Sequence, residues 1–250
     1  MSTPGSLDAK ILIRTFLRTY FVGATFNTRG LQTVGLALAM EPGLKVLYPD
    51  PGERRRVWKR YLKIYNTHPF WTPFLVGVFL ALESRIARKQ FPDTVLDQVK
   101  STVVFTLSAV GDSFFGGGLT VLWALGTACL LAAGQSWAAF CLGFFLFAVL
   151  NAFKLGTFIL GYRHGLAALT RIRTWDLVNW ARRIKVLNAA LLVMLWALVW
   201  PKDMNPAVWT GGVAAVLGLA YAVGRLRLNR ELLVGLGIVA GLFFLWIRVS

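Results

Sequence analysis

Long apolar stretches dominate the second half of the chain. No Lys, Arg, Asp or Glu occurs from Ser113 to Phe153. That run is about twice the roughly 20 residues that one helix needs to cross a bilayer. Gly134, Gln135 and Ser136 form a natural break near its middle. The pattern therefore predicts two consecutive hydrophobic helices, 119–133 and 137–153. Each is short for a full crossing, so a re-entrant hairpin is an alternative.

Four other segments have the same apolar character. Prolines 69 and 73 begin a shorter uncharged stretch, where a helix tolerates them. This stretch, residues 69–82, suits a helix that reaches half-way into the membrane or is buried in protein. Three longer hydrophobic helices are predicted at residues 186–200, 208–224 and 232–247.

Composition excludes several classes of protein. Hydrophobic residues make up 56% of the chain and charged residues 15%, with a mean hydropathy of +0.60. A soluble domain carries about 25% charged residues. Disorder, collagen and a soluble nucleic-acid binder are excluded. The prediction is an all-α, polytopic integral membrane protein with amphipathic N-terminal helices. By composition, residues 1–105 hold most of the charge and form a cytoplasm-facing region, and residues 106–250 form the hydrophobic, membrane-embedded region.

The charge is strongly unbalanced, with 27 Lys and Arg against 11 Asp and Glu and a net charge of +16. Because the cations flank apolar runs, they indicate membrane topology and contact with anionic lipid. Met1 to Lys10 lacks the apolar core of a signal peptide. The N-terminus and the basic clusters are predicted to be cytoplasmic, and the 201–207 link outside. The clusters lie at residues 10–18, 45–63, 85–100, 154–185 and 225–230.

One basic segment has a recognisable helix start. Asp50 can be the N-cap, Pro51 the first helical residue, and Glu53 completes a capping box. Apolar and aromatic residues then recur at helical spacing up to Tyr65, with Arg and Lys on the other face. Two interpretations remain open: a helix lying on an anionic membrane surface, or an ordinary solvated face of a packed helix.

Three hydrogen-bonding residues, Asn66, Thr67 and His68, join this segment to the stretch that begins at Pro69. Amide and imidazole groups both donate and accept, as a sugar site requires. The alternative is that Asn66 or Thr67 only caps a helix.

Two carboxylates interrupt apolar sequence. Glu83 can bind a substrate hydroxyl or pair internally, and the pattern favours the internal pair. Asp112 precedes three glycines, Gly116 to Gly118. It marks either an unwound, ligand-facing hinge or a capped helix start with a glycine packing face.

The sequence carries no recognisable catalytic constellation. It has no paired-carboxylate site, metal-ligand spacing, nucleophile elbow or P-loop. Cys129 and Cys141 lie inside the apolar run, so we expect small core residues and not a disulfide or metal site. We expect no cofactor. The pattern favours a conduit or binding subunit over a self-contained enzyme.

Four blocks of sequence resemble one family, the IID subunit of the mannose-family (mannose/fructose/sorbose) phosphotransferase system permease. They occur in family order and cover roughly residues 10 to 170. The second and third blocks are the most specific. The blocks are Phe26-Asn27 through Gln32 and Gly35 to Pro42 and Leu47-Tyr48-Pro49; Tyr65-Asn66-Thr67-His68-Pro69-Phe70 with Gly77 and Leu80-Ala81-Leu82-Glu83; Val110-Gly111-Asp112; and Asn151, Gly161-Tyr162 and Gly165.

The resemblance implies a role in the bacterial inner membrane. A IID subunit pairs with a IIC subunit, as a trimer of heterodimers, to take up a hexose that cytoplasmic IIA and IIB subunits phosphorylate. The phosphohistidines are then on IIA and IIB, and a sugar-bearing core moves against a fixed scaffold. Carried onto this chain, the residues at or near the sugar are Asn27, Gln32, Asn66, His68, Glu83 and Asp112.

Some positions depart from the family pattern. His68 stands where Gln is usual, Ser113 where Pro is usual, and Arg29-Gly30 replaces a Glu-Arg pair. The chain also looks shorter between Trp200 and the last helix. These departures imply either a different sugar or a diverged regulatory scaffold without transport. An unrelated membrane enzyme or lipid-binding protein is the third alternative.

Overall fold

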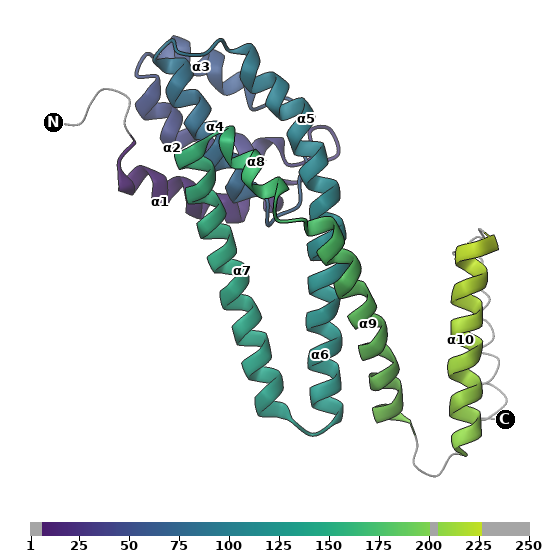
Figure 1. The fold of residues 1–250 in the computed structure, drawn as a ribbon. Coiled ribbons are helices and arrows are strands. Elements are labelled where there is room, and N and C mark those ends of the chain that lie inside the picture. Colours follow the sequence, from purple (N-terminus) through teal and green to yellow (C-terminus); the bar gives the residue numbers. More distant parts are fainter. Residues whose placement is uncertain (1–6, 201–204, 227–250) are drawn as a thin grey trace. The chain divides into compact units, whose positions relative to one another are not determined.

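The computed structural model describes residues 7–200 and 205–226, and all its regular elements in these residues are helices (Figure 1). The predicted all-α, polytopic membrane fold is confirmed. The predicted helix at 232–247 lies outside the described residues. Contacts divide the chain into two units, Met1–Leu192 and Val193–Ser250. The division predicted from composition, at 105/106, falls inside α5 (Thr94–Gly111) and stays a prediction.

The first unit begins with short helices. These are α1 (Ala9–Arg18), the 3-10 turns η1 (Thr19–Phe21) and η2 (Gly23–Thr25), α2 (Thr33–Leu47) and α3 (Pro51–Arg60). The helix start predicted near residue 50 is confirmed, because an Asp50 carboxylate oxygen accepts a hydrogen bond from the Glu53 amide at 2.6 Å. The helix ends at Arg60, before the end of the apolar pattern at Tyr65.

Helix α4 (Thr72–Ala87) forms the centre of the unit. Every residue from Trp71 to Leu80 is buried, so the protein-buried alternative is the correct one. It packs against α7 (Ser136–His164) through two glycines. A Cβ on Gly77 would lie 2.4 Å from the Phe158 carbonyl oxygen, and one on Gly161 would lie 2.5 Å from the Phe74 carbonyl oxygen. The two backbones therefore meet without side chains between them.

Two long helices run from this centre as an antiparallel pair, joined by the turn at residues 133–135 (Figure 1). One is continuous from Thr94 to Ala132, through α5, the π-helical segment η3 (Asp112–Thr120) and α6 (Val121–Ala132). The other is α7. They have 39 and 29 residues, and only 17% and 6% of their most apolar windows are buried in the protein. Long, apolar and exposed helices of this kind are membrane spans.

Both helices are longer than the apolar pattern predicted, and each is long and apolar enough to cross a membrane. The re-entrant hairpin stays an alternative prediction. The apolar pattern ended the second one at Phe153, before Lys154. The structure continues it, because the Lys154 ammonium lies over the rings of Tyr20 and Phe70, 4.3 and 4.9 Å from their centroids. A cation placed in this way can remain within a helix.

The remaining helices are α8 (Ala167–Arg173), α9 (Leu177–Val199) and α10 (Pro206–Leu226). The hydrophobic helix predicted at 208–224 falls within α10. The one predicted at 186–200 corresponds to α9, which begins earlier, at Leu177, and ends at Val199. The boundary between the two units lies inside α9, at Leu192/Val193. Cys129 is buried and Cys141 is exposed, and both are free thiols. The expectation that both are core residues therefore holds for Cys129 and is wrong for Cys141.

Candidate functional site

The candidate site is built around residues 65–71, which we call the site loop. The loop connects α3 to the buried helix α4. Backbone bonds fix its start: the Gln32 amide donates to the Tyr65 carbonyl at 2.9 Å, and Leu31 and Tyr65 form a parallel bridge. The Gln32 side chain, 8% exposed, adds a bond from the Thr67 amide to its Oε1 at 3.1 Å. Gln32 is therefore a scaffold of the loop.

Several polar groups of the site loop have no partner within residues 7–200 and 205–226. The hydroxyl of Thr67 and the indole Nε1 of Trp71 are buried and make no hydrogen bond there. The half-buried Asn66 side chain also makes none with the described residues. A buried polar group without a partner costs about 1–3 kcal/mol. These groups are therefore suited to bind the hydroxyl groups of a ligand.

His68 lies in an aromatic setting at the centre of the loop. Its ring stacks on Phe70 and Phe115, with centroids 5.5 and 5.3 Å apart. Burial lowers the pKa of His68, Lys154 lowers it further, and the Asp112 carboxylate opposes both. The neutral imidazole is thus favoured, and a neutral imidazole both donates and accepts hydrogen bonds.

The helix opposite His68 approaches very closely. A Cβ on Gly111 would lie 2.4 Å from the Cβ of His68 and 2.8 Å from Cδ1 of Trp71. Asp112 follows and is exposed, at the start of η3. The ligand-facing hinge stays a prediction, and the helix start is wrong, because the helix runs without a break from Thr94 to Ala132. It widens into a π-helix, a feature frequent at functional sites.

Helix α9 holds the other side of η3. The Lys185 ammonium donates to the Ser113 hydroxyl at 3.0 Å, and the Asn188 amide donates to the Gly118 carbonyl at 3.0 Å. Asn188 is 6% exposed. The sequence reasoning missed these contacts and Trp71. The signal available in the sequence was Lys185, a charged residue next to a predicted hydrophobic helix. A charge in that position is costly unless it has a partner.

Asn27 closes its own turn. Its Oδ1 accepts from the amides of Arg29 and Gly30 at 3.1 and 2.8 Å, and its Nδ2 donates to the carbonyls of Thr25 and Leu31 at 3.3 Å each. This turn supports the strand-like bridge to the site loop. Its side chain is committed to the backbone.

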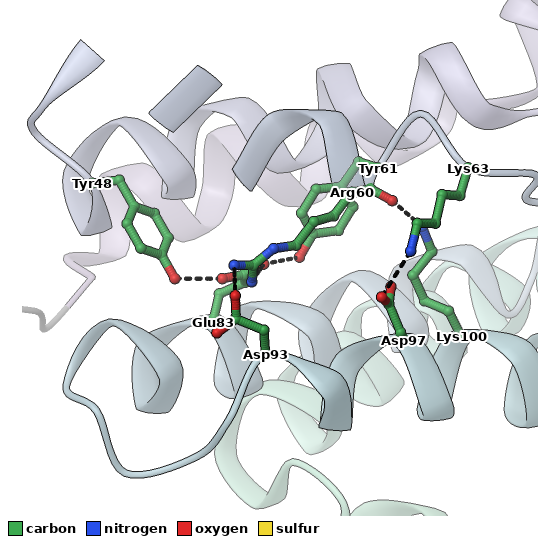
Figure 2. A network of polar contacts seen from close by, with 8 residues as sticks. All are labelled: Tyr48, Arg60, Tyr61, Lys63, Glu83, Asp93, Asp97 and Lys100. Atoms are coloured by element: carbon green, nitrogen blue, oxygen red, sulfur yellow. Dashed lines mark hydrogen bonds and ion pairs between the residues drawn. The ribbon is translucent and has the colours of Figure 1, made fainter. Parts of the chain in front are cut away.

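Glu83 lies apart, in a separate polar network (Figure 2). It is fully buried and accepts hydrogen bonds from the Tyr48 hydroxyl at 2.6 Å and the Tyr61 hydroxyl at 2.8 Å. Arg60 pairs with it at 3.8 Å and also with Asp93. The Lys100 ammonium donates to the Arg60 carbonyl at 2.7 Å. This is the internal pairing that the sequence pattern favoured.

The structure therefore groups part of the predicted site. Asn66 and His68 lie in the site loop, Gln32 is bonded to it, and Asp112 lies close by at the start of η3. Asn27 lies one turn away as support, and Glu83 belongs to the other network. Their roles toward a sugar stay predictions.

The comparisons with known proteins give the family. A family model described as the PTS system mannose/fructose/sorbose family IID component matches residues 6–197, most of the chain. The chain belongs to this family. The IID resemblance recognised in its sequence blocks is thus confirmed.

Named relatives of this IID component include three sugar permease subunits. The fructose permease IID component of Bacillus subtilis (strain 168) is 34% identical over 161 residues, which cover 64% of this chain and 57% of the relative. The mannose-specific EIID component of Escherichia coli (strain K12) is 31% identical over 153 residues, 60% of this chain and 52% of the relative. The sorbose-specific EIID component of Lacticaseibacillus casei is 32% identical over 159 residues, which cover 62% of this chain and 56% of the relative. The matches span somewhat over half the length of these relatives.

Solved structures agree with the IID fold. A cryoEM structure of the mannose transporter ManYZ in complex with microcin E492 matches with a TM-score of 0.57, at 22% identity over 97% of this chain and 96% of that one. A structure described as a membrane protein matches with a TM-score of 0.70, at the same identity and coverage. At this level of identity the likeness concerns the fold alone.

Proposed function

We propose that this IID component, together with a IIC subunit, carries a hexose across the bacterial cytoplasmic membrane while IIA and IIB subunits phosphorylate it. The names of its relatives, which act on fructose, mannose and sorbose, support the class of substrate. The association with IIC and the trimer of heterodimers are part of the same proposal. Its N-terminus and basic clusters face the cytoplasm, in line with the positive-inside rule.

One observation carries the proposal: the polar groups of Asn66, Thr67 and Trp71 in the site loop have no hydrogen-bond partner among the described residues. Neutral donors and acceptors beside an aromatic cluster suit a polyhydroxylated, uncharged ligand. His68 adds a neutral imidazole to this set. In our proposal the chain binds and moves sugar, and the phosphoryl group is carried by its partner subunits.

The test is uptake of labelled hexoses by cells without permeases of their own. The chain is co-expressed with IIC, IIA and IIB, as wild type, as Asn66→Ala and as Gln98→Ala, a control at an exposed position of α5. Loss of one hydrogen bond to the sugar costs about 0.5–1.5 kcal/mol. Phosphorylated sugar should accumulate in the wild type and the control, with an apparent KM raised about 2- to 10-fold in Asn66→Ala.

Two results would count against the proposal. An equal KM in all three chains would remove Asn66 from the site. A stable complex with IIC that takes up none of the hexoses tested would exclude hexose transport and favour a regulatory scaffold. His68 and Ser113 depart from the family pattern, and a regulatory scaffold without transport would account for those departures.

A further inference from the structure

Helix α3 is unusually rich in cations. The segment from Pro51 to Lys63 contains six basic residues and one acidic residue, Glu53. The six are Arg54, Arg55, Arg56, Lys59, Arg60 and Lys63.

Half of these cations are used inside the protein. Arg60 pairs with Asp93 and Glu83, and the Lys63 ammonium pairs with Asp97 at 2.7 Å (Figure 2). The Arg54 guanidinium donates to the carbonyls of Tyr48 and Pro49 at 3.3 and 3.2 Å. These bonds attach both ends of α3 to its neighbours.

Three cations remain, Arg55, Arg56 and Lys59, which we call the basic face. All three are exposed, and within residues 7–200 and 205–226 none of them forms an ion pair. The helix beneath them is held in place, so their charges project from a fixed frame. A pre-organised charged surface of this kind suits a binding partner of opposite charge.

The packing of α3 argues against a lipid partner. A helix that binds a membrane surface inserts its apolar side between the lipids. In α3 that side is occupied, because Val57 is 2% exposed and the adjoining Tyr61 is fully buried against the protein core. Trp58 also packs against this core. The apolar side of α3 itself is therefore not available for lipid; Leu62 and Ile64, which are 41% and 64% exposed, follow the helix and lie outside it.

A hollow lies beside the basic face, between α2 and α3. Its volume is about 590 Å³, and Arg55, Lys45 and Trp58 are on its wall. Glu41, also on the wall, is neutralised by Arg18 and Lys45 at 2.7 and 2.8 Å. A protein loop with acidic side chains can enter such a hollow, whereas a planar membrane surface cannot follow it.

We infer that the basic face and this hollow form a docking surface for an acidic, soluble protein. The inference rests on the proposed function, under which the partner is the IIB subunit that brings the phosphoryl group to the complex. Opposite charges steer the encounter and set its salt dependence. The docking surface is separate from the site loop, so partner binding and sugar binding use different residues.

The test measures binding of purified IIB, phosphorylated and unphosphorylated, to the full chain with its IIC subunit in phosphatidylcholine nanodiscs. The variant is Arg55→Gln/Arg56→Gln/Lys59→Gln. The matched control removes three other exposed cations, Lys10→Gln/Arg14→Gln/Arg182→Gln. The assay uses about 0.1 M salt, at which the Debye length is about 10 Å. We expect the variant to bind IIB at least 10-fold more weakly than wild type, and the control to bind within 2-fold of wild type.

A parallel arm measures binding of the detergent-purified chain to vesicles with and without about 30% phosphatidylglycerol. Equal loss of IIB binding in variant and control, or no loss in the variant, would overturn the inference. So would a wild type that binds no IIB while the variant alone loses vesicle binding, since the partner would then be lipid. The IIB assay contains no sugar, so its outcome is independent of hexose uptake and distinguishes failure of the docking surface from failure of transport.

Discussion

At Glu83, burial and hydrogen bonding act on one carboxylate in opposite directions. Burial raises its pKa, while bonds from Tyr48 and Tyr61 and the charge of Arg60 lower it, and burial is the larger effect. The folded protein therefore keeps this proton to a higher pH than the unfolded chain does. Stability from this group is fully present below the ordinary pKa of a glutamate and is lost as the pH rises through the raised value.

Glu83→Gln should remove this pH dependence, because glutamine cannot ionise. Its amide oxygen can accept the hydrogen bond of one tyrosine, and its NH2 group can donate to the hydroxyl oxygen of the other. We expect the unfolding midpoint of the variant to rise relative to wild type between pH 4.5 and 7.5, measured by tryptophan fluorescence in detergent. Glu41→Gln is a control of opposite sign, because Lys45 and Arg18 lower the pKa of Glu41. That variant should be less stable than wild type by a nearly constant amount above the ordinary pKa of a glutamate, and the difference should shrink as the pH falls through the lowered pKa of Glu41. Parallel curves for Glu83→Gln and wild type would contradict the assignment.

At the scale of elements, the sequence predicted helices better than it predicted their partners. Apolar runs located most of the helices, and capping residues located the start of α3. The pairing of α4 with α7 was not predictable, because Gly77 and Gly161 resemble any glycine until a backbone lies against them. Lys154 and Lys185 gave wrong helix boundaries for a related reason. The apolar pattern places each at the limit of a hydrophobic helix, but each lies inside one, because its partners come from segments far away in the chain.

Gly77→Ala should therefore be strongly destabilising. The added methyl group would meet the Phe158 carbonyl at 2.4 Å, and a backbone carbonyl inside a helix cannot move aside. We expect a cost of about 3 kcal/mol, the upper end for overpacking, seen as a lower unfolding midpoint or a lower yield of folded protein. In Gly156→Ala on α7, no atom of the described residues lies within 4 Å of the new methyl group. It should be neutral or stabilising by up to about 1 kcal/mol. Equal effects of the two substitutions would refute the close α4–α7 contact.

At the scale of the whole molecule, the candidate site was predicted in part. The motif Asn66-Thr67-His68 drew attention to the site loop because polar residues next to apolar sequence need an explanation. Glu83 also interrupts apolar sequence, but its carboxylate already accepts hydrogen bonds from Tyr48 and Tyr61, which lie just after the ends of α2 and α3. A sequence shows which polar groups must be satisfied. Only the fold shows which of them already are.

The membrane hairpin makes one further prediction about topology. The turn between α6 and α7 is about 58 Å along the helix axis from Thr94, at 1.5 Å per residue, and both helices are long enough to cross. With the basic clusters at 85–100 and 154–185 in the cytoplasm, this turn must face the outside. In a Cys129→Ala/Cys141→Ala background, Gln135→Cys should react with a membrane-impermeant maleimide on intact spheroplasts. Ala167→Cys, exposed on α8, should react only after the membrane is permeabilised. Protection of both cysteines would indicate a re-entrant hairpin, and the reverse pattern would indicate an inverted chain.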